Sequence, residues 1–239
     1  MTSSTSEATV TDSIARQQSL YVQDGMSDED IARQADLYGP LTDSVRELIE
    51  IALLTEVEDP ADLRAAQENL EAAKQILRKR INPGPYGVRW GASGQKRAWG
   101  NAAVGLRNPI APPLVLNHDP DGRAWCDFHL GSQYEGPAGL THGGVSALIL
   151  DQVLGSAAEA GGAPGMTGTL TLRYRRPTPL GALHTEARID RVEGVKTIVV
   201  GHIADADGVC VEAEGIFILP KWARQQDPST IGGPAPDGF

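Results

Sequence analysis

One apolar helix, set between a single strand pattern and a run of further strand patterns, constrains the fold of this chain most. Residues 143–159 form that helix pattern, and residues 124–130 before it alternate between apolar and polar side chains, as a half-buried strand does. Four more strand patterns follow without another helix, at residues 167–175, 183–192, 196–205 and 209–219. Strands joined by short turns pair antiparallel, and a lone apolar helix must be covered by the sheet that it interrupts. The sequence therefore predicts an α+β fold with an antiparallel sheet around one central helix.

Two helical patterns precede this unit. From Leu41 onward, apolar residues recur at the spacing of one helical stripe. Asp59 and Pro60 are typical of a second helix start, and the segment 82–85 contains the Pro and Gly residues that end it. The pair is too small to hold a core alone, so we expect it to pack on the rest of the chain or on another subunit.

Composition divides the chain into four predicted segments. Residues 1–26 are rich in Ser and Thr and are expected to form a flexible arm, and residues 27–85 a helical extension. Residues 86–220 form the sheet domain, in which 86–122 is expected to be loop. Residues 221–239 are rich in Pro and Gly and predict a flexible tail.

Charge and cysteine usage restrict the partners. The formal net charge is −10, which disfavours nucleic acid and anionic membranes as partners. No apolar run approaches the ~20 residues that span a bilayer, and the first residues lack the pattern of a secretory signal. The two cysteines provide no disulfide framework. We expect a soluble cytoplasmic protein without a metal, since the histidines show no metal-ligand spacing.

The segment around the start of the central helix carries the candidate chemistry. His142 is followed by Gly143 and Gly144, which leave the first backbone N–H groups of the helix unshielded. These groups have no partner inside a helix and can polarise a carbonyl oxygen. Asp151 then interrupts an otherwise apolar helix, and burying an unpaired carboxylate there needs a reason.

The spacing of these groups predicts a dimer. Gly143 and Asp151 are eight residues apart, which is about 12 Å along a helix. One substrate carbonyl cannot easily touch both on the same helix. Two antiparallel copies of the helix would place Gly143 of one subunit opposite Asp151 of the other.

This stretch resembles the His-Gly-Gly motif of the PaaI-like acyl-CoA thioesterases, which have the hotdog fold. It is more similar still to the mammalian thioesterase superfamily members that act on long-chain acyl-CoA. Where bacterial PaaI-like enzymes often have Asn, this chain has Gly136, as the long-chain group does. The shared features are Glu135-Gly136-Pro137, His142 with Asp151 nine residues later, Thr167, Arg176-Pro177 and the turn from Val192 to Lys196.

The resemblance implies an acyl-CoA substrate, whose CoA is no separate cofactor, and a dimer or dimer of dimers. It implies that the Gly143 amide binds the thioester oxygen, that Asp151 activates water or attacks directly, and that Thr167 assists. His142 is expected to support the site mainly as a helix cap. The N-terminal helices are expected to cover a surface, and they could border the acyl tunnel.

Each role has a structural alternative. Asp151 could lie on a solvated helix face, and the glycines 143 and 144 could serve close packing. Thr167 could satisfy the backbone at a strand start. Candidate ligands for the CoA, besides Gly144, are Arg173, Arg175, Arg176 and Lys196. These cations could equally be charges on the exposed side of strands.

Two other functions compete with hydrolysis. A hydratase or dehydratase on the same fold is expected to have an Asp with a His five residues later, or a His-x-Pro-type loop, and neither follows Asp151, since residue 156 is Ser156. A non-catalytic acyl-CoA-binding or regulatory protein remains the alternative, which a test of thiol release from acyl-CoA would separate from the hydrolase.

Overall fold

The structure is a computed structural model that describes residues 21–112 and 114–219. The predicted flexible tail and most of the predicted N-terminal arm lie outside these residues.

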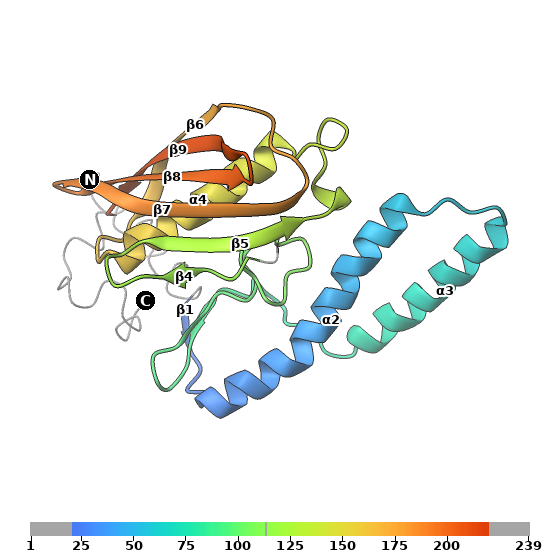
Figure 1. The fold of residues 1–239 in the computed structure, drawn as a ribbon. Coiled ribbons are helices and arrows are strands. Elements are labelled where there is room, and N and C mark those ends of the chain that lie inside the picture. The colour runs from blue at the N-terminus through green and yellow to red at the C-terminus, as the bar shows by residue number, and fades with distance from the viewer. Residues whose placement is uncertain (1–20, 113, 220–239) are drawn as a thin grey trace, which may run out of the picture.

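A six-stranded antiparallel sheet dominates the fold (Figure 1). Its strand order is β4-β5-β7-β8-β9-β6, so β6 forms one edge. The alternation in β5 holds, since its apolar residues are buried and its polar residues face outward. The strands are β4 (Asn117–His118), β5 (Ala124–Leu130), β6 (Met166–Tyr174), β7 (Gly181–Glu193), β8 (Lys196–Asp205) and β9 (Gly208–Ile218).

Helix α4 (Gly143–Ala160) lies inside the curve of this sheet (Figure 1). One face of α4 is fully buried against the strands, with Ile149, Leu150, Val153 and Leu154 at 0% exposure. The core continues through β5, β7, β8 and β9. The predicted hotdog arrangement is confirmed.

A smaller sheet corrects two sequence predictions. Strand β1 (Tyr21–Gln23) pairs in parallel with β2 (Val88–Trp90), which pairs with β3 (Lys96–Arg97). Residues 21–23 were expected to belong to a flexible arm, and residues 86–122 to be loop. Both expectations were wrong where β1 to β4 form, because strands of two or three residues are too short to show a period and are defined by their pairing partners.

The helical extension is longer than its apolar stripe indicated. Helix α2 (Asp28–Leu54) begins well before Leu41, and the Ser27 side chain caps it by accepting from Asp30 N. Helix α3 (Pro60–Leu77) starts as predicted, with the Asp59 carboxylate accepting from Ala61 N at 2.8 Å. None of the helices in the described part of the chain combines the length and apolarity needed to cross a membrane.

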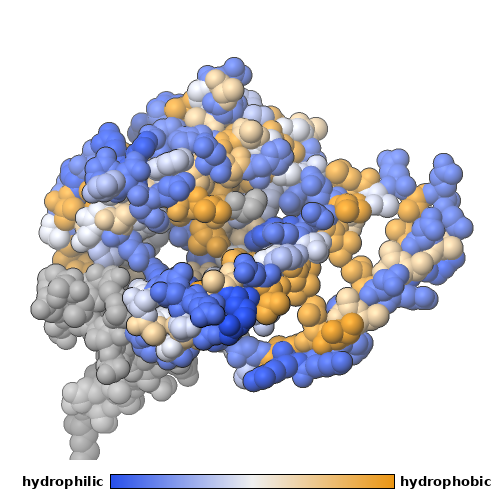
Figure 2. Space-filling view, turned by 60° about the horizontal axis from the view of Figure 1, so that its bottom comes forward, coloured by the Kyte–Doolittle hydropathy of each residue, from blue (hydrophilic) through white to orange (hydrophobic). Residues whose placement is uncertain are grey.

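Only α2 packs on the sheet domain. Arg46 donates to the carbonyl oxygens of Gly105 and Asn108, both at 3.2 Å, and Glu50 accepts from Ser132 N at 3.0 Å. Every residue of α3 is exposed, and the hairpin of α2 and α3 projects from the domain (Figure 1). Hydrophobic side chains run along both of its arms (Figure 2). Within one chain, the expected packing is therefore met for α2 and not for α3.

Candidate active site

The start of α4 is built around His142. Its Nδ1 accepts from Gly144 N at 3.0 Å, and its backbone N–H donates to Tyr134 O at 2.9 Å. His142 is thus the N-cap of the helix, as expected. Among the described residues, the Gly143 N–H has no acceptor, as is usual for the first turn of a helix. One amide is therefore free to bind an external oxygen.

Tyr174, at the end of β6, holds this first turn. Its hydroxyl donates to Gly143 O at 2.9 Å. A Cβ added at Gly143 would lie 3.2 Å from the same hydroxyl oxygen, so glycine gives the turn the space for this contact. The sequence showed Tyr174 only as one member of an alternating strand face.

Asp151 and Thr167 come together. Thr167 Oγ1, near the start of β6, donates to Asp151 Oδ1 at 2.8 Å. Asp151 is half-buried, which corrects the expectation of a buried carboxylate. The reason is that it lies on the α4 face turned away from the core, whereas its neighbours Leu150 and Val153 face the sheet.

A cleft of ≈ 1090 Å³ opens beside this pair. Asp151, Gln152 and Thr167 lie on its wall. Asn101 Nδ2 donates to Gln152 Oε1 at 3.0 Å and so ties the opposite wall to α4. The remaining wall is mixed. Its apolar part includes Val88, Trp99, Val104, Leu106, Leu114, Leu116 and Phe217, and its polar part includes Lys96, Arg97, His118, Asp119, Ser156 and Glu159. Sequence analysis missed this wall because it comes from a segment without periodicity.

The described chain does not bring Gly143 and Asp151 together, since both lie on α4 about 12 Å apart along its axis. The α4 face that carries them is only partly covered, with Leu148 36% exposed. Beside it, the edge strand β6 exposes Met166 and Tyr174. A single chain therefore holds the oxyanion donor and the carboxylate in separate places.

Two of the four candidate CoA-binding cations are engaged within the chain. Arg175 pairs with Glu212 at 2.7 Å. Arg176 pairs with Asp205 and donates to Gly208 O. That guanidinium lowers the pKa of Asp205 to about 2, chiefly through its hydrogen bond. In the described part of the chain, Arg173 and Lys196 make no side-chain hydrogen bond or ion pair, so they are the better candidates for an external anion.

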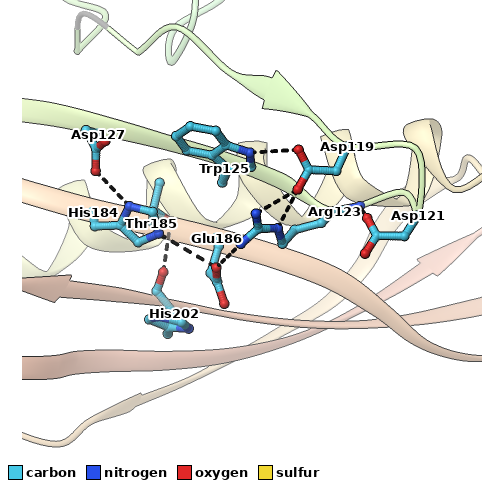
Figure 3. Close-up of polar contacts among 9 residues, drawn as sticks. All are labelled: Asp119, Asp121, Arg123, Trp125, Asp127, His184, Thr185, Glu186 and His202. Atoms are coloured by element: carbon cyan, nitrogen blue, oxygen red, sulfur yellow. Dashed lines mark hydrogen bonds and ion pairs between the residues drawn. The ribbon is translucent and has the colours of Figure 1, made fainter.

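A second polar cluster lies on the sheet face opposite α4 (Figure 3). His184 Nδ1 lies 2.8 Å from Asp127 Oδ1, and its ring stacks on Trp125 with centroids 6.2 Å apart. Burial lowers the pKa of the neighbouring His202. Across residues 21–112 and 114–219, no three His, Cys, Asp or Glu side chains are grouped so that they could hold a metal ion. The cluster is separate from Asp151 and Gly143.

Comparison with known proteins assigns the family. The family model of the thioesterase superfamily matches residues 138–212. A solved structure of a thioesterase superfamily protein is 33% identical, with a TM-score of 0.69, and the match covers 83% of this chain and 98% of that one. This chain belongs to the thioesterase superfamily.

Curated relatives of this thioesterase-superfamily chain carry more specific names. It is 36% identical over 102 residues to the acyl-coenzyme A thioesterase THEM4 of Xenopus laevis, a match that covers 41% of this chain and 45% of the relative. For THEM4 of Bos taurus the identity is 32% over 108 residues, which covers 44% of each chain. The match thus spans less than half the length of these relatives.

Proposed function

We propose that this protein hydrolyses the thioester of an acyl-CoA to a free acid and CoA. The observation that carries the proposal is the Asp151–Thr167 pair on the wall of a cleft that has both an apolar part and a polar part. A carboxylate beside the apolar part of a cleft suits a substrate with a reactive thioester at one end and a hydrocarbon chain at the other. The names of the curated relatives agree with this substrate class.

In the proposed reaction, Asp151 takes a proton from water as the water oxygen attacks the thioester carbon. The Gly143 N–H stabilises the negative charge that develops on the carbonyl oxygen. The C–S bond then breaks, and the CoA sulfur leaves with a proton. In the second route, the Asp151 carboxylate attacks the same carbon, the CoA thiolate leaves, and water cleaves the mixed anhydride. Both routes need an ionised Asp151.

The proposed active unit is a homodimer, or a dimer of dimers, in which Gly143 of one subunit faces Asp151 of the other. The exposed Leu148 on α4 and the exposed edge strand β6 support it, since uncovered apolar surface and an open strand edge are typical of an interface. Antiparallel α4 helices would bring the two groups to one substrate carbonyl.

The CoA portion would bind at the ends of α4 and β6. Gly144 exposes backbone beside the oxyanion donor, and Arg173 and Lys196 offer unpaired cations for phosphates. Arg175 and Arg176 would contribute less, because each already has a carboxylate partner. The proposal includes no cofactor beyond the CoA of the substrate, and a cytoplasmic location, which two free cysteines favour.

A hydrolysis screen tests this function. Purified protein is given short, medium, long and aromatic acyl-CoAs with a thiol-trapping dye. The protein itself should not react, because Cys126 and Cys210 are buried and burial raises the pKa of Cys126 to about 11. We expect thiol release from at least one acyl class. Binding of acyl-CoA without any thiol release would favour the non-catalytic alternative.

A further inference from the structure

Two hollows of the molecule share one wall. The cleft beside Asp151 has a volume of ≈ 1090 Å³, and a second groove of ≈ 570 Å³ lies under the N-terminal half of α2. Trp99 and Leu106 line both of them, and no other residue does so. These two side chains therefore separate the cleft from the groove, and we name them the partition.

The partition is held firmly in place. Trp99 is 8% exposed, its ring stacks on Tyr86 with centroids 6.4 Å apart, and the Arg97 guanidinium lies 5.5 Å from its centroid. Its carbonyl oxygen accepts from Arg107 N at 2.9 Å. Because contacts hold both the backbone of Trp99 and its ring, the ring forms a rigid part of the wall.

Leu106 is placed by a tight turn. Asn101 Oδ1 accepts from Ala103 N and Val104 N, and Gly105 N donates to Asn101 O at 3.0 Å. A Cβ at Gly105 would come within 2.3 Å of that carbonyl oxygen, so the turn requires glycine. Because Asn101 also donates to Gln152, the turn is anchored one residue from Asp151.

Small residues of α2 line the groove beyond the partition. Ile31, Ala32 and Ala35 form its apolar part, and Asp28, Ser93 and Gln95 form its polar part. Ile31 is 3% exposed and packs on Gly91, where an added Cβ would lie 2.7 Å from its Cδ1. The helical extension thus borders an open groove that adjoins the cleft at Trp99 and Leu106.

We propose that Trp99 and Leu106 are specificity-determining residues that end the acyl cleft and set the longest chain it accepts. This inference rests on the proposed function, because it assumes that the acyl chain occupies the Asp151 cleft. Truncating either residue would join the two hollows and let a longer chain pass under α2. Each methylene that becomes buried should favour binding about fourfold, from ~0.8 kcal/mol per CH₂.

The test compares Trp99→Ala and Leu106→Ala with the natural protein over a graded series of straight-chain saturated acyl-CoAs. Thiol release gives kcat/KM for each length. S-alkyl-CoA thioethers, which lack the carbonyl, give Kd for each length by calorimetry without any catalysis. In both series we expect long-chain substrates or ligands to gain at least about fifteenfold over short-chain ones, in kcat/KM and in affinity respectively, which is the equivalent of two buried methylenes.

Two further variants separate a change in chain-length preference from a general loosening of the fold. Trp90→Ala removes an equally buried tryptophan, 6% exposed, that lines neither hollow, and should leave the ratio unchanged. Ala35→Phe narrows the groove from the α2 side. It should reverse the shift in the Trp99→Ala or Leu106→Ala background and have no effect when the partition is intact.

The outcomes are distinct. If the natural protein releases no thiol from any acyl-CoA, the proposed function fails, while the thioether affinities still test the partition. If Trp99→Ala does not fold, as judged by circular dichroism, Leu106→Ala with and without Ala35→Phe decides. An unchanged length profile in the folded truncations, or an equal shift in Trp90→Ala, would overturn the inference.

Discussion

Thr167 Oγ1 donates a hydrogen bond to Asp151 Oδ1 at 2.8 Å, and this contact joins the edge strand β6 to the middle of α4. Among the described residues, the second oxygen of the carboxylate accepts no hydrogen bond, and Asp151 lies on the wall of the cleft. In the proposed reaction, the Thr167 hydroxyl orients the Asp151 carboxylate and does not itself react.

The role of Thr167 can be tested by substitution. Thr167→Ala should lower kcat about tenfold, since a hydrogen bond to a charged group is worth roughly 1.5–3 kcal/mol and this one is partly exposed to water. Thr167→Ser keeps the hydroxyl and should retain most of the rate. Steady-state thiol release measures both. Equal rates for the Ala and Ser variants would show that the hydrogen bond has no part in catalysis.

The free N–H of Gly143 can be removed without disturbing the helix. Gly143 is the first helical residue, where proline is well tolerated, and His142 before it has the extended backbone that proline requires. Gly143→Pro should lower kcat by about 10²–10³-fold, the usual cost of one oxyanion donor.

Gly143→Ala is the matched control, because it adds the same Cβ near Tyr174 and keeps the N–H. It should stay within a few-fold of the natural rate. If both variants lose activity equally, crowding at Tyr174 is responsible and the amide has no assigned role.

Mixed dimers test whether the site is shared. A heterodimer of Gly143→Pro and Asp151→Asn subunits holds one intact site and one with both lesions. Random mixing makes half of the dimers mixed, so about a quarter of the natural activity should return after subunit exchange. Light scattering checks that mixed dimers form. If they form and the mixture stays inactive, the whole site lies within one subunit.

The large sheet and α4 could be predicted because each has a strong local period, and the turns between β7, β8 and β9 lie where Gly194 and Gly208 indicate them. The pairing of β1 with β2 could not, because a three-residue parallel strand depends on a partner some 65 residues away. The helical extension was predicted from residue 27, but the apolar stripe was recognised only from Leu41, because the first half of α2 lacks a regular stripe and has a proline at position 40.

Of the candidate site, Asp151 and the cap at His142 follow from the residue pattern at the central helix, whereas the role of Thr167 was implied only by the family resemblance. The exposure of Asp151 could not be predicted, because helical periodicity does not distinguish a face that packs on the core from a face that packs on another subunit. The walls at Trp99 and Leu106 come from an irregular segment, whose path is decided by capping contacts of Asn101.

The Arg176–Asp205 pair should make stability depend on pH in the acidic range. The folded pKa of Asp205 is lowered to about 2 from its ordinary 3.8 by the Arg176 hydrogen bond. A lowered pKa means that the carboxylate stabilises the fold fully above the ordinary value, and that this contribution is lost as the pH falls through the folded value.

Arg176→Met should therefore melt at a lower temperature than the natural protein near neutral pH, and the difference should shrink as the pH falls from about 4 to about 2. Thermal melts followed by circular dichroism measure this. Asp205→Asn is expected to behave in the same way. A difference in melting temperature that stays constant down to pH 2 would mean that the ion pair is not its source.

The most direct test of the account is kcat for Asp151→Asn, which keeps the size of the side chain and removes its charge. Asp127→Asn is the matched control, since Asp127 is also an aspartate with one side-chain hydrogen bond, from His184 on the opposite face of the sheet. The account predicts at least a ~100-fold loss of thiol release for Asp151→Asn and a natural rate for Asp127→Asn. A folded Asp151→Asn protein that keeps more than about a tenth of the natural kcat would contradict the assignment of Asp151 as base or nucleophile.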